Sequence, residues 1–229
     1  MPDLELLRDF DWTIDYDELA AKMRVRRGTR QEEELRSLLC HALEVGRPKA
    51  LYGAVYIDER GEDYLVLDGA RFTSRVLRVN LEHAHRVFVY CCTCGTELAE
   101  WTNGLTDMLQ RFWAEGIQMA ALRSSSGALS DQLEKEYHIG QASSQAPGSL
   151  PNWPLQQQRE LFSLLGDTER LIGVRLTDHY VMIPAKSVSG IRFPTETHFE
   201  SCQLCPREGC PGRRLDYEPS LYENKYLPS

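Results

Sequence analysis

The sequence lacks the features of several protein classes. No apolar run in its 229 residues approaches the ~20 residues that cross a bilayer. The acidic start MPDLELLRDFDW has neither the basic segment nor the apolar run of a signal peptide. Lysine and arginine number 26 against 34 acidic residues, and this net charge of −8 argues against a surface for nucleic-acid phosphates. We therefore expect a cytoplasmic protein without a membrane or nucleic-acid partner.

Familiar catalytic signatures are also missing. The chain has no G-x-S-x-G nucleophile turn, no phosphate-binding glycine loop and no H-E-x-x-H zinc motif. Hydrolase and kinase chemistry is therefore not indicated. The sequence identifies no catalytic residue, and whether the protein is an enzyme stays open.

What the sequence does contain is a mixture of helical and strand patterns. Residues 30–45 have the apolar spacing of an amphipathic helix, which Thr29 caps and Gly46 ends. Alternating residues predict two strands within 50–69, around a turn at Gly61. Further elements follow: a short helix capped by Thr73 or Ser74, a buried strand in HRVFVYCCTCG, a helix in LQQQRELFSLLG, and two strands around Pro184.

Two segments of the second half are less regular. From residue 96 to 137 the pattern is helical, and Gly104, Gly116 and Gly127 are expected to divide it into two or more helices. Residues 139–154, IGQASSQAPGSLPNWP, form the longest predicted loop. A loop of that length in a compact domain is disordered or functional, and its Trp153 favours a packed, functional loop.

The tail FESCQLCPREGCPGRR, residues 199–214, carries Cys202, Cys205 and Cys210 at the spacing C-x2-C-x4-C. Thiolates bind zinc, copper(I) and iron–sulfur clusters, and a reducing compartment keeps cysteines available as ligands. A structural zinc contributes roughly 10–16 kcal/mol in small peptides, which is enough to order such a tail. We predict one shared metal centre; the alternative is three unrelated thiols on a loose tail.

The fourth ligand has two candidates. His198 completes a zinc site of three cysteines and one histidine, whereas a four-iron cluster takes a fourth cysteine or leaves one iron open. Cys94, at the end of the buried strand, is the candidate cysteine. Its neighbours Cys91 and Cys92 alternate between the faces of the strand, so at least one of them belongs to the core. Cys40 is also expected to be a core residue.

The stretch LTDHYVMIPAKSVSGIRF resembles the activation (reactivation) domain of cobalamin-dependent methionine synthase, which carries L-T-x-S-x-x-M-x-P-x-x-S-V-S-G. APGSLPNWPLQQQRELFSLLG is similar to the loop and helix of stand-alone relatives, S-P-G-Y-G-D-W-P-L followed by a Gln and a Leu-Phe pair. FVYCCTCGTELAEW resembles their strand, T-x-G turn and helix. The likeness spans residues 60–195. The motif matches are Leu176, Thr177, Met182, Pro184, Ser187, Val188, Ser189 and Gly190.

The resemblance implies an α/β fold with a twisted, largely antiparallel sheet flanked by helices. It assigns residues 1–197 to the domain and leaves 198–229 as the cysteine-rich tail. In this family the domain binds S-adenosylmethionine and covers the corrinoid while cob(II)alamin is reduced and remethylated. The cofactor-binding candidates that follow are Thr93, Gly95, Pro147, Gly148, Ser149, Trp153, Ser187 and Ser189.

Three positions depart from the family pattern. Ser144 stands where the family has an arginine, Gly127 where it has a helix glutamate, and Ser149 where it has a tyrosine. A sulfonium with a carboxylate tail is recognised by a carboxylate and an arginine. The sequence therefore predicts weak or absent S-adenosylmethionine binding.

Together these features predict an accessory protein of corrinoid-dependent methyl transfer. Its partner would be a corrinoid protein or a cobalamin-dependent methyltransferase, and an iron–sulfur cluster in the tail would reduce the inactive Co(II) corrinoid. Two alternatives stay open. One is a non-catalytic module that binds a corrinoid protein and carries structural zinc, and the other is a small S-adenosylmethionine-binding enzyme.

Overall fold

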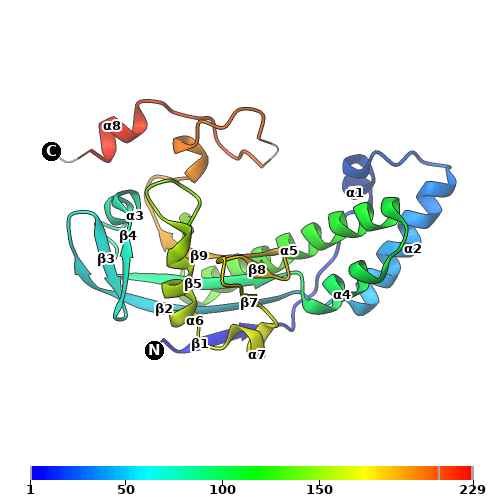
Figure 1. Ribbon diagram of the computed structural model, residues 1–229, viewed down its shortest axis with the longest axis horizontal. Coiled ribbons are helices and arrows are strands. Elements are labelled where there is room, and N and C mark those ends of the chain that lie inside the picture. The colour runs from blue at the N-terminus through cyan, green and yellow to red at the C-terminus, as the bar shows by residue number, and fades with distance from the viewer. Residues whose placement is uncertain (1, 211, 228–229) are drawn as a thin grey trace.

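The computed structural model describes residues 2–210 and 212–227, and its centre is a seven-stranded sheet (Figure 1). The strand order is β4-β3-β2-β5-β9-β6, with β1 also paired to β2, and every ladder is antiparallel. The expected α/β fold with a largely antiparallel sheet is thus confirmed. The strands are β1 (Leu4–Leu7), β2 (Lys49–Arg60), β3 (Tyr64–Leu67), β4 (Ala70–Thr73), β5 (Arg86–Thr93), β6 (Ala142–Gln145) and β9 (Ser187–Pro194); β7 (Arg175–Leu176) and β8 (Met182–Ile183) pair separately.

Helices cover both faces of the sheet. Successive residues of β5 face opposite sides, because side chains alternate along a strand. Phe88 and Tyr90 pack with α1, α2, α4 and α5, whereas Val87 and Val89 pack with α3, α6 and α7. The continuous apolar run of β5 therefore reflects burial on both faces. The helices are α1 (Tyr16–Met23), α2 (Arg30–Val45), α3 (Arg75–Asn80), α4 (Thr96–Gly104), α5 (Met108–Tyr137), α6 (Gln158–Leu165), α7 (Thr168–Ile172) and α8 (Leu221–Lys225), with 3-10 turns η1 (Leu155–Gln157) and η2 (Ser201–Leu204).

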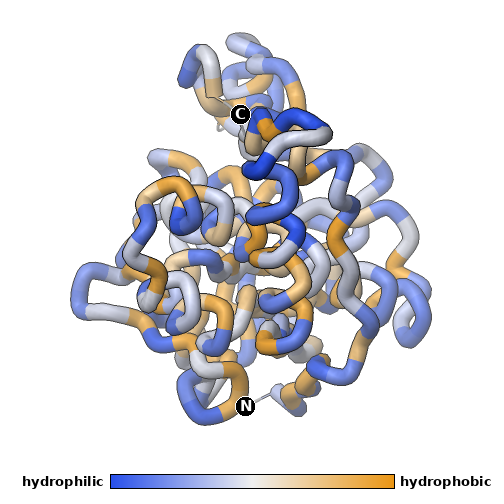
Figure 2. Tube along the Cα trace, turned by 90° about the vertical axis from the view of Figure 1, so that its right-hand side faces the viewer, coloured by the Kyte–Doolittle hydropathy of each residue, from blue (hydrophilic) through white to orange (hydrophobic). Residues whose placement is uncertain are grey.

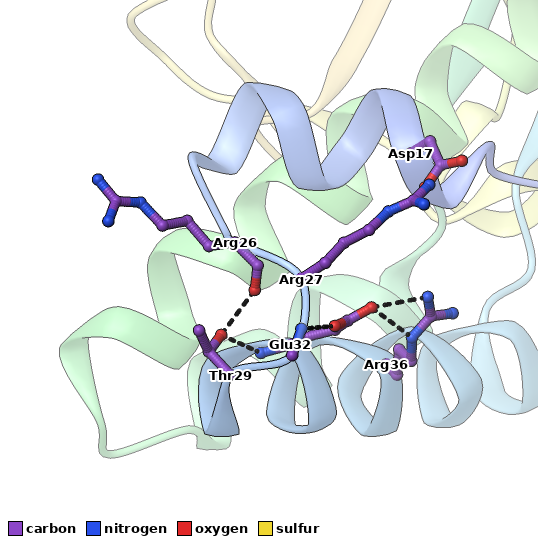
Figure 3. Close-up of polar contacts among 7 residues, drawn as sticks. Asp17, Arg26, Arg27, Thr29, Glu32 and Arg36 are labelled. Carbon is purple, nitrogen blue, oxygen red and sulfur yellow. Dashed lines mark hydrogen bonds and ion pairs between the residues drawn. The ribbon is translucent and has the colours of Figure 1, made fainter.

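The start of α2 follows the sequence prediction. The Thr29 hydroxyl accepts the Glu32 backbone N–H at 3.3 Å, which satisfies a donor that the first turn leaves free (Figure 3). The Glu32 carboxylate in turn accepts the Gly28 backbone N–H at 2.6 Å and an Arg36 side-chain N–H at 2.9 Å. The Gly28 bond is the first reason why the pKa of Glu32 lies below its ordinary value. Gly46 ends the helix as expected.

The long helix α5 corrects one prediction. Gly104 does end α4, but Gly116 and Gly127 lie inside α5, which runs unbroken for 30 residues. At Gly116 a Cβ would lie 2.9 Å from the sulfur of Met23, so the missing side chain lets α1 approach. Packing of α5 on the sheet and on α1 outweighs the roughly 1 kcal/mol by which an interior glycine weakens a helix.

The long loop and the strands near Pro184 also differ in detail from the prediction. Residues 142–145 of the expected loop form the edge strand β6. Trp153 is buried, as packing required; its ring meets Phe72 edge to face at 6.1 Å and its indole N–H donates to Gln157 at 2.9 Å. Pro184 separates β8 from β9, but β8 pairs with β7 and not with β9.

The tail folds back on the domain. Phe199 and Tyr226 meet at 6.2 Å and pack against Val76 of α3 and Leu150 of the loop. In Figure 2 the tail rises above the rest of the molecule as a largely hydrophilic tube. This small apolar cluster is separate from the two clusters that sandwich the sheet. No helix within the described residues is long and apolar enough to cross a membrane.

Candidate functional site

The hydroxyls of the sequence motif on β9 bond within the protein. Ser187 donates to the Thr93 hydroxyl at 2.9 Å, and Ser189 donates to Gln158 Oε1 at 2.9 Å. Thr93, Ser189 and Gln158 are buried, and buried polar groups are stable when they are paired in this way. The motif hydroxyls therefore tie β9 to β5 and α6, which is sufficient reason for these residues without a ligand.

Gly95, at the turn after β5, is required by the backbone. Its φ is +92°, and a Cβ there would lie 2.4 Å from the Arg47 carbonyl oxygen. Its N–H donates to the Thr93 hydroxyl at 3.2 Å. Only glycine satisfies both the dihedral angle and this close approach. The T-x-G turn thus has a structural cause of its own.

The Pro-Gly loop presents its tip to the tail. Pro147 is buried, whereas Gly148 and Ser149 are exposed. The Gly148 N–H donates to the Trp153 carbonyl at 2.7 Å and closes the loop. At the tip, the Ser201 hydroxyl of η2 lies 3.4 Å from the Ser149 hydroxyl. The loop tip and the start of the cysteine segment are therefore neighbours.

The structure separates the two positions at which the sequence departs from the family's charged contacts. Ser144 lies on the edge strand β6, opposite Arg192 of β9. Gly127 opens onto a cleft of about 500 Å³, together with Asp9, Asp11 and Asp131. That cleft also includes the end of β1, which is paired to β2, three strands away from β6. Gly127 and Ser144 therefore do not face one shared site.

Two arginines near Ser144 escaped the sequence reasoning. Arg192 stands directly across the ladder, and its Nε is buried without a hydrogen-bond partner among the described residues. Burial raises the pKa of Tyr90 to about 12, while the charges of Arg192 and of Arg214 in the tail oppose that rise. Both cations thus act on the place where the family's arginine is missing. Strand pairing and tail folding bring them there, which no local motif signals.

The cysteines of β5 and of the turn after it are core residues. Cys91, Cys92 and Cys94 have 0% exposed surface. Burial raises the pKa of Cys92 and of Cys94 to about 12, so both stay protonated near neutral pH. Cys94 packs in the cluster of α1, α2, α4 and α5, to which no described tail residue belongs. The expectation for Cys40 was wrong, because its position on α2 is exposed.

The tail cysteines are half-buried and lie in a loop built around Arg213. The Arg213 guanidinium donates to the carbonyl oxygens of Cys202 and Cys205, each at 3.1 Å. The Arg213 backbone N–H donates to the Cys210 carbonyl at 3.2 Å. One residue thus bonds to the main chain of all three cysteines.

The side chains of this loop are not gathered around one point. Across residues 2–210 and 212–227, no three histidine, cysteine, aspartate or glutamate side chains are arranged to hold a metal ion. His198, the candidate zinc ligand, lies with its Nε2 3.3 Å from Glu200, which also pairs with Arg214 at 2.7 Å. The donor chemistry suits a soft metal, and three thiolates would have to turn toward one another to bind it.

Comparison with known proteins agrees with these features. Residues 105–203 match the family model described as vitamin B12 dependent methionine synthase, activation domain. The chain belongs to the family of these activation domains. The crystal structure of the MetH reactivation domain bound to AdoHcy matches with a TM-score of 0.63 and 14% identity, covering 88% of this chain and 82% of that one. No curated protein matches the chain.

The family match ends inside the cysteine segment. It includes Cys202, but Cys205 and Cys210 lie beyond residue 203. The activation domain thus accounts for the motif strand and the Pro-Gly loop. The remaining cysteines and their arginine are the part of this chain that the family match does not explain.

Proposed function

We propose that this protein reactivates a corrinoid protein and that its tail carries the metal centre that supplies the electron. Methionine synthase activation domains act together with a corrinoid domain, and this chain belongs to that family. The observation that carries the finer proposal is the loop of Cys202, Cys205 and Cys210, whose main chain is already ordered around one arginine.

An iron–sulfur cluster is the centre that fits this role. Three thiolates hold three irons of a four-iron cluster and leave the fourth open to another ligand. Cys94 is not included, because it is buried in a different cluster from the tail. The reaction moves one electron from the reduced cluster to Co(II) and yields Co(I), and a low-potential one-electron donor restores the cluster.

The position of the tail supports the same proposal. The tail folds over the Pro-Gly loop, with Ser201 against Ser149, and is fixed to α3 by Tyr226, whose hydroxyl donates to Asn80 at 2.9 Å. A partner that bound over the Pro-Gly loop would therefore meet the cysteine segment on the same side. Electron transfer requires this proximity.

The direct test begins with protein purified without air and analysed for iron, sulfide and zinc. A brown protein with iron and sulfide supports the cluster. The reduced protein is then mixed with a Co(II) corrinoid protein, and the absorbance band of Co(I) is followed. Binding should be tighter to the base-off Co(II) state, since that is the species that needs reduction. If a fully loaded, redox-active protein forms no Co(I), the electron-donor role is refuted.

A second candidate is a binding module in which zinc orders the tail. His198 favours it, because it lies close to the segment and a set of three cysteines and one histidine suits structural zinc. A colourless protein with one equivalent of zinc and no sulfide would establish this candidate. Such a protein would still bind the corrinoid partner but would reduce nothing.

A third candidate is an S-adenosylmethionine-binding protein. Ser144 removes a charged contact of the family, and losing one partner of a buried charged contact typically costs about 2–5 kcal/mol. We therefore expect millimolar or weaker binding by calorimetry. Micromolar binding would contradict this, and loss of that binding in Arg192→Gln would show that Arg192 has replaced the missing arginine.

A further inference from the structure

Arg213 occupies an unusual position for a surface arginine. Its guanidinium makes hydrogen bonds to the carbonyl oxygens of Cys202, Cys205 and Arg207, and a longer one to Leu215 at 3.4 Å. All four acceptors are main-chain groups. The segment from 202 to 215 is thus wrapped around one positive charge.

The geometry suits arginine and no other side chain. A guanidinium presents five N–H donors in a planar, rigid fork, whereas lysine offers a compact ammonium on a flexible stem. Here Nη1 reaches Cys202 while Nη2 reaches Cys205, so the fork spans the two cysteines of the C-x2-C turn. The Arg213 backbone N–H then fixes Cys210 on the returning half of the loop.

The rest of the tail is held without Arg213. Tyr226 packs on Phe199, its hydroxyl bonds to Asn80, and its carbonyl accepts Arg75 Nε at 3.0 Å. The Glu218 backbone N–H also closes the chain onto the Gln203 carbonyl at 2.9 Å. Loss of Arg213 should therefore loosen the cysteine loop and leave the attachment of the tail intact.

We propose that Arg213 is the positioning residue of the metal centre. It sets the main-chain path that lets the thiols of Cys202, Cys205 and Cys210 turn toward one point. Its charge also lies beside the place where a centre bound by thiolates would be negative. This inference rests on the proposed metal site and names the residue that organises it.

The test compares three variants in the metal-free full-length protein, titrated with Co²⁺ and followed by the thiolate-to-metal absorption band. Arg213→Gln removes both fork and charge, and Arg213→Lys keeps the charge alone. Arg207→Gln is the matched control, since Arg207 is an exposed arginine of the same loop. We expect at least a tenfold loss of Co²⁺ affinity in both Arg213 variants and less than a twofold change in Arg207→Gln. Wild-type affinity in both Arg213 variants would overturn the proposal.

Two further measurements separate this inference from folding effects and from the proposed function. In any cluster-loaded fraction, Arg213→Gln should have a lower reduction potential than Arg213→Lys, because a nearby cation favours the more negative reduced state. A purely structural role would leave the two potentials equal.

Phenylarsine oxide, which bridges neighbouring thiols, probes the loop without any metal. If the wild type takes up neither iron nor Co²⁺ but captures the arsenical in an Arg213-dependent way, the metal centre fails while the positioning role stands. If the arsenical is captured equally by wild type and Arg213→Gln, Arg213 does not gather the thiols and the inference fails.

Discussion

The protein uses cysteine in two regions with opposite surroundings. Cys91, Cys92 and Cys94 lie at and just beyond the end of β5 with no exposed surface, and burial raises the pKa of Cys92 and Cys94 to about 12. Cys202 and Cys205 lie in a half-buried loop, close to a guanidinium. The first group behaves as small apolar side chains, whereas the second is accessible for chemistry.

This contrast separates packing from ligand chemistry within one residue type. The thiolate is the metal ligand, so a thiol that burial keeps protonated is a poor one. Sequence spacing alone treats CCTCG and CQLCPREGC as comparable clusters. Their surroundings make only the second a candidate metal site.

The largest expected difference is in thiol labelling. In native, metal-free protein, the tail cysteines and Cys40 should react with an aromatic disulfide reagent at once. Cys91, Cys92 and Cys94 should react at least about 1,000-fold more slowly, because labelling requires the small unfolded fraction. Peptide mass spectrometry at timed intervals measures this. Rapid labelling of Cys94 would mean that the turn after β5 opens, and would restore it as a candidate ligand.

The next difference concerns metal content. Replacing Cys202, Cys205 or Cys210 by serine should each remove most of the bound metal, since a shared centre loses a ligand in every case. Cys91→Ala, in the core, should retain wild-type metal content and serves as the control. Elemental analysis of anaerobically purified protein gives the answer, and full metal content in all three serine variants would disprove a shared centre.

Stability should respond in the opposite direction. Cys91→Ser places a hydroxyl in an apolar cluster, and an unsatisfied buried polar group costs roughly 1–3 kcal/mol. Cys205→Ser, on the half-buried loop, should stay within about 0.5 kcal/mol in metal-free protein. Urea unfolding of both variants measures the free energies of unfolding. A similar loss in both would mean that the tail loop is a stabilising element.

The smallest effect is a dependence of stability on pH. Cys92 and Cys94 have folded-state pKa values near 12, above the ordinary 9.0. In alkaline solution the unfolded chain therefore loses these protons first and is stabilised. Stability is complete below about pH 9 and falls as the pH rises toward 12, by about 0.5–1 kcal/mol between pH 8 and 9 for the two groups.

Urea midpoints at several pH values would show this decline. The double variant Cys92→Ala/Cys94→Ala should have a shallower slope than the wild type. An unchanged slope would assign the decline to other groups, such as Tyr52, whose pKa burial also raises.

Several features could be predicted from the sequence because local bonds decide them. The Thr29 cap and the Gly46 end of α2 depend on residues within one turn. The doubly buried strand β5 follows from a continuous apolar run, and Gly95 from the turn after it. The motif strand then led to the family that the comparisons support.

The tertiary structure alone decided the rest, because long-range packing leaves no local pattern. The unbroken path of α5 through Gly116 depends on the approach of Met23, about ninety residues away in the chain. The wide separation of Gly127 from Ser144 follows from strand order. Arg213 meets the carbonyls of Cys202 and Cys205 only because the tail turns back on itself. Spacing proposed which cysteines share a site, and folding showed which residue holds their loop together.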